Sequence, residues 1–267
     1  MFKIALIQMK GSFDKKESSD KAEKMIREAA FNGAELVVLP EMWNCPYASQ
    51  YFREYAETWQ GPTVSFMSRL AEELGINLVG GSIPELDDDL VYNTSFVFNR
   101  EGKIVAKHRK THLFDIDVPG RIRFMESETL TPGNGATLAD LDLCRIGIGI
   151  CYDVRFPEFF RKMALEGALL IVLPAAFSVP TGEAHWDITI RARALDNQVY
   201  FAACSPARDM IGPYQAYGGS CVANPWGEFD AHAGLEEEVI YSVIDLDRVR
   251  AVREQLPLLK HRKPQFY

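Results

Sequence analysis

Cys151 stands where a polypeptide can present a reactive group. It ends the alternating stretch RIGIGIC, which predicts a strand, and precedes YDVRFPEFF, which opens a predicted helix. α/β proteins place reactive side chains at such strand-to-helix junctions. A thiol there can be held as a thiolate by the N-terminus of a helix and a nearby cation. The position alone leaves two interpretations, a nucleophile or an ordinary core cysteine.

Glu41 and Lys110 end two other predicted strands. Glu41 directly follows the apolar stretch LVVLP. Burial favours the protonated form of a carboxylate, which would make this residue a base near neutral pH; the alternative is a strand-end acid in a surface ion pair. Lys110 ends KIVAKHRK, at the point where a long loop begins. Its competitors as the cation of a pocket are His108, Arg109 and His112.

The other cysteines and the histidines do not indicate a metal site. The five cysteines are an odd number, and no pair has the C-x-x-C spacing of a zinc or redox site. Three lie in apolar, strand-like stretches and are expected to be buried structural thiols: Cys144, Cys204 and Cys221. A Cys–His hydrolase would need one of four histidines beside Cys151: His108, His112, His185 or His232.

The composition predicts a globular protein without affinity for nucleic acids or membranes. Hydrophobic residues make up 47% and charged residues 25% of the 267 residues. A formal net charge of −8 argues against nonspecific binding of nucleic acid and against a polybasic membrane face. The longest apolar run, over 168–177, is half of the roughly 20 residues that a membrane helix needs. Reduced cysteines and an N-terminus unlike a signal peptide indicate the cytoplasm.

Strands and helices alternate along the chain. The patterns predict strands over 2–9, 35–40, 76–84, 91–99, 103–107, 144–150, 169–174, 199–204, 218–223 and 239–244. They predict helices over 18–32, 63–74, 157–166, 186–197 and 247–255. Residues 111–135 read as a long irregular loop, which in compact domains is often functional, and about 256–267 as a polar tail.

An internal echo predicts how these elements pack. Residues 33–41 read GAELVVLPE and residues 167–175 read GALLIVLPA, each after an alternating strand and an amphipathic helix. We interpret this as two similar β-α-β halves in one domain over 1–267, rather than as chance similarity of two buried strands. Two facing sheets covered by helices give an α/β protein with a four-layer α-β-β-α sandwich.

Several motifs resemble those of the nitrilase (carbon–nitrogen hydrolase) superfamily. LPE at 39–41, HRKTHLFD at 108–115 and GICYDVRFPE at 149–158 are similar to its Glu, Lys and Cys motifs, in the same order. Further similar stretches are FMES at 124–127, PTGEAHW at 180–186, RARALDNQVY at 191–200 and NPWGE at 224–228. The resemblance implies an α-β-β-α sandwich that forms a homodimer or a higher homo-oligomer. It also implies hydrolysis of nonpeptide carbon–nitrogen bonds without a metal or organic cofactor.

The resemblance assigns roles to individual residues. It makes Cys151 the nucleophile, Glu41 the proton carrier and Lys110 a stabiliser of the oxyanion, which the backbone N–H of Tyr152 also binds. Glu126, in FMES, matches the second glutamate of the family and would position Lys110 and the amide nitrogen of the substrate. Glu128 lies two residues further on and departs from the motif. An exposed loop acid is the alternative for both glutamates.

Within this superfamily the chain is most similar to the omega-amidases, which release ammonia from short dicarboxylic monoamides. HLFDIDVPGRIRFMES, AHW and NQVYFAACSPARD carry that similarity. The deaminated-glutathione amidases share CYDxRFPE and PTGxAHW, and an N-carbamoyl amide hydrolase is a further alternative. Tyr152 follows the cysteine where nitrilases typically have Trp, which favours amides over nitriles. A catalytically silent binding protein on this fold is disfavoured, because all three triad positions are filled.

Three more residues are expected in the substrate pocket. Arg155 lies four residues after the nucleophile and could bind a distal carboxylate of the substrate through a bidentate contact; a structural salt bridge is its alternative. Phe177 and Thr181, in AAFSVPTG, are placed at the pocket wall by the resemblance. The expected partner of the protein is therefore a small amide.

Overall fold

The computed structural model describes residues 1–118, 122–210 and 214–266. Two β-α-β units form its framework, and the two strands of each unit are parallel neighbours. The first unit consists of β1 (Phe2–Gln8), α1 (Lys15–Phe31) and β2 (Leu36–Val38). The second consists of β10 (Arg145–Ile148), α4 (Pro157–Leu165) and β11 (Leu170–Pro174). This repeated order confirms the two similar halves predicted from the internal echo.

Each unit continues through a second helix into a third parallel strand. α3 (Pro62–Leu74) leads to β3 (Asn77–Val79), and α5 (Val179–Asn197) leads to β12 (Tyr200–Cys204). Antiparallel strands complete the two sheets: β4 (Ile83–Asp87), β5 (Leu90–Phe98), β6 (Ile104–Arg109), β9 (Thr137–Asp140), β13 (Cys221–Ala223), β14 (Phe229–His232) and β15 (Glu238–Ile244). The first sheet has the order β15-β1-β2-β3-β5-β4, with β6 beside β5, and the second has the order β14-β13-β12-β11-β10-β9.

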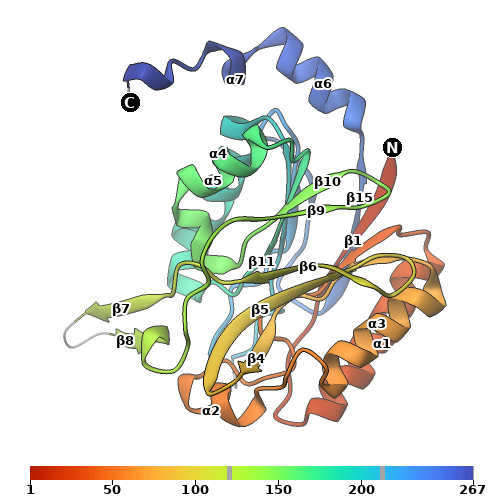
Figure 1. The fold of residues 1–267 in the computed structure, drawn as a ribbon, viewed down its shortest axis with the longest axis vertical. Coiled ribbons are helices and arrows are strands. Elements are labelled where there is room, and N and C mark those ends of the chain that lie inside the picture. The colour runs from red at the N-terminus through yellow and green to blue at the C-terminus, as the bar shows by residue number, and fades with distance from the viewer. Residues whose placement is uncertain (119–121, 211–213, 267) are drawn as a thin grey trace.

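Three hydrophobic cores divide the molecule into four layers. Successive residues of β1 face different cores: Ile4 and Leu6 lie between the sheets, whereas Ala5 and Ile7 face α1 and α3. A third core, which includes Trp186, lies between the second sheet and the helices α4 and α5. Figure 1 shows α1 and α3 on one side of the two sheets and α4 and α5 on the other. The predicted α-β-β-α sandwich is therefore confirmed.

Three predicted elements have different bounds, each for a local reason. α1 begins at Lys15 rather than at 18, because the Asp14 side chain caps it by accepting a hydrogen bond from the Lys16 backbone N–H. α5 begins at Val179 rather than at 186, with a proline in its first turn. The single strand predicted over 76–84 is wrong. The chain breaks between β3 and β4 at Gly81, which has φ +62° and whose absent Cβ would lie 2.1 Å from the Pro40 carbonyl oxygen.

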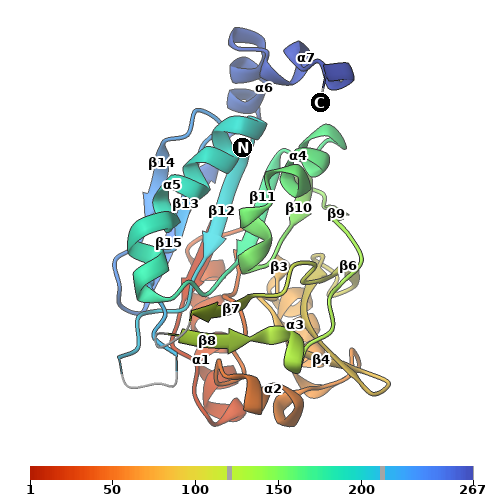
Figure 2. The same cartoon turned by 90° about the vertical axis from the view of Figure 1, so that its left-hand side faces the viewer.

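The segment over 111–135 is more ordered than the prediction of an irregular loop. β7 (Asp115–Val118) pairs with β8 (Ile122–Met125), and the 3-10 turn η1 (Glu126–Glu128) follows. Figure 1 shows this hairpin projecting from the sandwich, toward the viewer in Figure 2. Pro119 and Gly120 of the expected loop lie outside the described residues. The helix α2 (Ser49–Tyr55) and the strands β9 and β14 were not predicted either.

The C-terminal segment leaves the body of the sandwich. It contains α6 (Leu246–Gln255), α7 (Leu258–His261) and a 3-10 turn over Pro264–Phe266, so the expected polar tail is partly helical. Figure 1 shows α6 and α7 extending past the end of the sheets. Among the helices of the described ranges, none is long and apolar enough to cross a membrane.

Candidate active site

Glu41 lies just past the end of β2 and is held by four hydrogen-bond donors. Its Oε1 atom accepts from Lys110 Nζ at 3.1 Å, Asn93 Nδ2 at 2.8 Å and the Tyr47 hydroxyl at 3.1 Å. Its Oε2 atom accepts from the Ala176 backbone N–H at 2.8 Å. The alternative of a surface ion pair is wrong, since the Glu41 side chain is fully buried.

The Ala176 contact joins the two halves of the molecule. Ala176 follows β11, the strand whose sequence echoes β2, so the ends of the two echoed strands meet at this hydrogen bond. The structure places β2 and β10 in different sheets, facing each other across the central core.

Lys110 directly follows β6, and its side chain contacts the buried carboxylates of Glu41 and Glu126. Its Nζ atom lies 2.9 Å from Glu126 Oε1 and 3.1 Å from Glu41 Oε1. Burial lowers the pKa of this ammonium, but the charges of Glu126 and Glu41 outweigh that effect and raise the pKa well above its ordinary value. Lys110 is therefore a fixed cation at neutral pH. Arg109 points away, as alternation along a strand predicts, and pairs with Glu85.

Glu126 begins the turn η1 and completes the buried cluster. Its Oε1 atom accepts from Lys110 Nζ and lies 2.9 Å from the Tyr47 hydroxyl, while its Oε2 atom accepts from the Phe114 backbone N–H at 2.7 Å. Burial and the charge of Glu41 raise the pKa of the Glu126 carboxyl, and Lys110 opposes this rise. Glu128 instead lies on the surface and pairs with Arg123, so Glu126 is the glutamate of this stretch that reaches Lys110.

Cys151 is the first residue of the 3-10 turn η2 (Cys151–Arg155) and adopts a left-handed backbone, with φ +43°. The thiol is buried. Burial and the charge of Glu41 raise its pKa well above the ordinary value, although Lys110 lowers it. The helix α4 starts only at Pro157, so its N-terminus does not lie directly at Cys151. Cys151 needs a base to become a nucleophile.

Asp153 fixes the turn that carries Cys151, and the sequence reasoning missed it. Its carboxylate accepts hydrogen bonds from the backbone N–H groups of Ile150 and His112, at 2.9 Å each. The side chains of His112 and His108 contact it at 2.7 and 3.1 Å. These contacts outweigh the effect of burial and hold the pKa of Asp153 well below its ordinary value. His108 and His112 therefore connect the cysteine turn to the end of β6, where Lys110 follows.

The other two candidate histidines also have partners away from the thiol. His185 Nδ1 lies 3.1 Å from Arg155 Nη2, and His232 Nε2 lies 3.1 Å from Asp187 Oδ1. The geometry therefore gives no support to a Cys–His arrangement. In the described part of the chain, no group of three or more His, Cys, Asp and Glu side chains could hold a metal ion.

A small cavity of about 20 Å³ lies over Cys151. The predicted pocket residues Tyr152, Arg155, Phe177 and Thr181 line it, together with Phe114, Ala176 and Tyr214. The Arg155 guanidinium lies 4.7 Å from the centre of the Phe177 ring. No carboxylate of the described ranges forms an ion pair with Arg155, so the structural salt bridge considered for it is not found there. This cation remains available to an anionic ligand.

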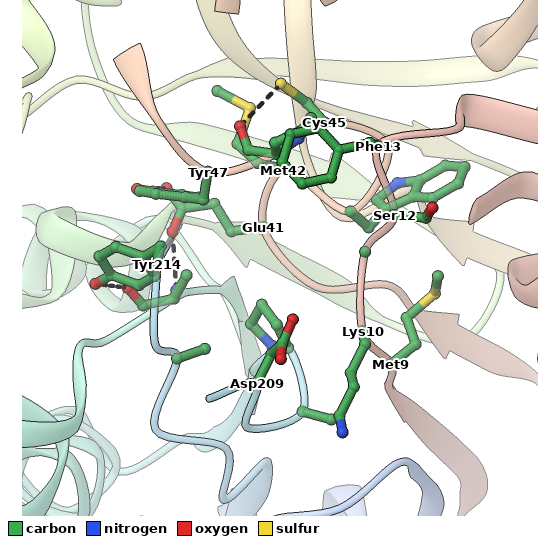
Figure 3. A pocket seen from close by; sticks show the side chains of 17 residues that line it. Met9, Lys10, Ser12, Phe13, Glu41, Met42, Cys45, Tyr47, Asp209 and Tyr214 are labelled. Carbon is green, nitrogen blue, oxygen red and sulfur yellow. Dashed lines mark hydrogen bonds between the residues drawn. The ribbon is translucent and has the colours of Figure 1, made fainter. Parts of the chain in front are cut away.

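A second cavity, of about 110 Å³, is lined by Glu41, Met42 and residues of the loop that follows β1 (Figure 3). Tyr214 and Ala176 line both cavities, and Tyr47 lines the larger one. Figure 3 shows Tyr47 and Tyr214 beside the Glu41 carboxylate. The Tyr47 and Tyr214 ring centres are 4.7 Å apart. These two residues, like Asn93, carry no motif signal that the sequence reasoning used.

The arrangement can carry out acyl transfer. A buried thiol lies among a carboxylate able to take its proton, a lysine with a permanent charge and backbone N–H groups, which together meet the needs of a covalent thioester mechanism. The thiol alone would react slowly, because it is protonated at rest. The cluster therefore supports a cysteine nucleophile that is activated by its neighbour when a substrate is bound.

Comparison with known proteins identifies the family. The family model described as carbon–nitrogen hydrolase matches residues 3–254. The chain is 50% identical to Omega-amidase NIT2-B of Xenopus laevis and 49% identical to Omega-amidase NIT2 of Homo sapiens; each alignment covers 100% of this chain and 96% of the relative.

Solved structures agree with this assignment. Nit3 of Saccharomyces cerevisiae, described as a member of branch 10 of the nitrilase superfamily, superposes with a TM-score of 0.91 at 44% identity, covering 98% of this chain and 96% of that one. The NitFhit protein of C. elegans superposes with a TM-score of 0.93 at 32% identity, covering 100% of this chain and 66% of that one. The chain therefore belongs to the carbon–nitrogen hydrolase family of the nitrilase superfamily.

Proposed function

We propose that this protein is an omega-amidase that hydrolyses short dicarboxylic monoamides, such as 2-oxoglutaramate and 2-oxosuccinamate, to the dicarboxylate and ammonia. The observation that carries the proposal is the buried Glu41, Lys110 and Cys151 cluster beside a cavity that also contains Arg155. Similarity over the full length to relatives named omega-amidases supports the same substrate class.

In the first half-reaction Cys151 Sγ forms a bond to the amide carbon while Glu41 takes the thiol proton. The carbonyl π electrons move to oxygen, and the Lys110 ammonium and the Tyr152 backbone N–H stabilise that oxyanion. The carbon–nitrogen bond then breaks, and Glu41 gives its proton to the leaving nitrogen. Ammonia departs, and a thioester remains on Cys151.

In the second half-reaction Glu41 takes a proton from water, and the resulting hydroxide adds to the thioester carbon. The carbon–sulfur bond breaks as the tetrahedral intermediate collapses, and Glu41 returns the proton to the thiolate of Cys151. The dicarboxylate product then leaves. Glu126 holds Lys110 in place through both steps and contributes to binding of the amide nitrogen. The residues of the chain thus supply every proton transfer without a cofactor.

Arg155 supplies the proposed selectivity for a substrate with a second, distal carboxylate. Its guanidinium lines the cavity together with Cys151, and the Phe177 ring supports it from one side. Phe177 and Thr181 also line this cavity.

The remaining assignments concern the whole chain. We propose that residues 1–267 form one catalytic domain, because the central core draws on strands of both halves and β15 pairs with β1 in the first sheet. We further propose that the protein forms a homodimer and acts in the cytoplasm. The exposed apolar side chains of Ile188 and Leu195 on α5 support an interface on that outer helix layer.

The test is ammonia release from 2-oxosuccinamate, deaminated glutathione and an N-carbamoyl amide, by the wild type and by Cys151→Ala. We expect ammonia from the short monoamide with the wild type and none with the variant. A slow substrate should add the mass of its acyl group to Cys151 and leave the other four cysteines unmodified. Faster ammonia release from deaminated glutathione than from 2-oxosuccinamate would instead indicate a deaminated-glutathione amidase. No turnover of any amide would indicate a silent binding protein.

A further inference from the structure

The two oxygens of Glu41 have different numbers of hydrogen-bond donors. Oε1 lies within hydrogen-bond distance of Lys110 Nζ, Asn93 Nδ2 and the Tyr47 hydroxyl, whereas Oε2 accepts from the Ala176 backbone N–H alone. A carboxylate oxygen has two acceptor sites. Three donors therefore compete for the two acceptor sites of Oε1. One acceptor site of Oε2 remains free.

Tyr47 connects Glu41 Oε1 to Glu126, the second glutamate of the cluster. Its hydroxyl lies 3.1 Å from Glu41 Oε1 and 2.9 Å from Glu126 Oε1, so its single hydrogen is shared between the two carboxylates. The Tyr47 ring is fixed by aromatic neighbours, with Tyr214 at 4.7 Å and Phe124 at 5.9 Å between ring centres. Burial and the charges of Glu126 and Glu41 raise the pKa of Tyr47 well above its ordinary value, so the hydroxyl keeps its hydrogen.

Asn93 supports the same oxygen from the sheet. It lies in the middle of β5, is fully buried, and donates its amide hydrogen to Glu41 Oε1 at 2.8 Å. The backbone of Asn93 also accepts from the Lys110 backbone N–H at 2.8 Å. One residue of β5 therefore sets the relative positions of the base and the lysine.

We infer that Tyr47 and Asn93 are positioning residues that hold Glu41 Oε1, so that Oε2 alone takes the proton of Cys151 and returns it. This inference rests on the proposed amidase function and assigns the proton transfers of that function to one atom. Neither residue contacts the small cavity over Cys151. They therefore act through Glu41 rather than on the substrate.

The arrangement predicts a loss of kcat rather than of substrate binding when these donors are removed. Without them the Glu41 carboxylate can turn, so that Oε2 no longer faces Cys151 while Lys110 and the Ala176 backbone N–H remain its partners. The proton transfers should slow, whereas KM should stay nearly unchanged, because neither residue lines the cavity over Cys151.

The experiment compares the wild type with Tyr47→Phe and Asn93→Leu, which remove the donors and keep similar side-chain volumes. We expect kcat for 2-oxosuccinamate to fall roughly ten- to hundredfold in each variant, with little change in KM.

Tyr55→Phe is the matched control. The Tyr55 hydroxyl, on the helix α2, donates to the Phe13 carbonyl oxygen at 2.6 Å, outside the carboxylate cluster, so its removal should leave kcat and KM unchanged. An unchanged kcat in the Tyr47 and Asn93 variants, or a loss that lies in KM rather than in kcat, would overturn the inference. If one variant fails to fold, the other decides. A wild type that releases no ammonia would refute the proposed function itself.

Discussion

Arg155 is the residue on which the proposed substrate charge preference depends. We expect Arg155→Ala to lose roughly ten- to hundredfold in kcat/KM on 2-oxosuccinamate, because removal of one partner of a charge-assisted hydrogen bond costs about 1.5–3 kcal/mol. A neutral short amide has no distal carboxylate and should lose little. Steady-state kinetics on the two substrates measures the difference. An equal loss on both would make Arg155 a structural residue, most simply through its contact with His185.

Glu41 gives the second prediction at this scale. Glu41→Gln should lower kcat by about 10²- to 10⁴-fold, the usual contribution of a general base, because an amide cannot carry the thiol proton. Circular dichroism should show an intact fold. Glu128→Gln is the matched control, since Glu128 is an exposed glutamate of η1 that pairs with Arg123. A Glu41→Gln variant within a few-fold of the wild type would remove Glu41 from the mechanism.

The sequence identified reactive residues where a strand ends and missed those that act from other places. Glu41, Lys110 and Cys151 each follow or end a recognisable apolar or alternating stretch, so their positions were visible. Tyr47 lies in an aperiodic loop, and Asn93 lies inside a strand. Their burial against Glu41 depends on how distant segments pack, which a local pattern does not report.

At the scale of elements, the turn η2 holds the nucleophile because Asp153 binds it to the end of β6. We expect Asp153→Asn to reduce the free energy of unfolding at pH 7 by about 3–5 kcal/mol, as for other buried charge networks that lose one partner. The amide would also place an NH₂ group against N–H groups that need an acceptor. Urea unfolding of the two proteins measures this loss. Asp140→Asn, at an exposed acid paired with Arg145, is the control.

The same element has a defined pH dependence. Interactions in the folded state depress the pKa of Asp153 below the value of 3.8 taken for a free aspartate. Its stabilisation is therefore fully present above that value and is lost as the pH falls toward the folded-state pKa. The difference between the wild type and Asp153→Asn should shrink by about 1 kcal/mol from pH 7 to about pH 3. A difference that stays constant would contradict the assignment of an ionised Asp153.

Elements with strong local signals were predicted well. The strands β1, β2 and β11 and the helices α3 and α4 lie within a few residues of their predicted bounds, because apolar period and capping residues mark them. The start of α5 was missed, since its first turns lack a clear apolar period. The hairpin β7–β8 was missed because short strands on the surface depend on pairing with each other. The break at Gly81 reflects the close approach of the Pro40 backbone.

At the scale of the whole molecule, the outer face of α5 should form the proposed dimer interface. Ile188 is 68% exposed there, and Leu195 lies on the same helix. We expect Ile188→Asp to shift the sedimentation coefficient from dimer toward monomer, because a buried charge at an apolar interface is costly. Phe31→Asp, at a residue 92% exposed on the opposite helix layer, should leave the assembly unchanged. A monomeric wild type would remove the homodimer proposal.

The architecture of the sandwich followed from one repeated sequence pattern, whereas the strand order of the sheets did not. The echo between 33–41 and 167–175 correctly predicted two β-α-β halves, because each of the two similar strands is preceded by a helix and another strand. It did not give the order of the strands within either sheet, which depends on pairing between segments far apart in the chain. The packing of the two sheets then brings Ala176 to Glu41.

The left-handed backbone at Cys151 offers a way to recognise relatives that have lost catalytic activity. A side chain other than glycine at φ +43° costs roughly 1–2 kcal/mol, and selection retains that strain only while the thiol is in use. In a lineage that no longer needs catalysis, glycine at this position would relieve the backbone strain of the turn. Serine or alanine would keep that strain without supplying a thiol nucleophile. A glycine in place of this cysteine would therefore mark a long-established pseudoenzyme, and a serine or alanine a recent loss.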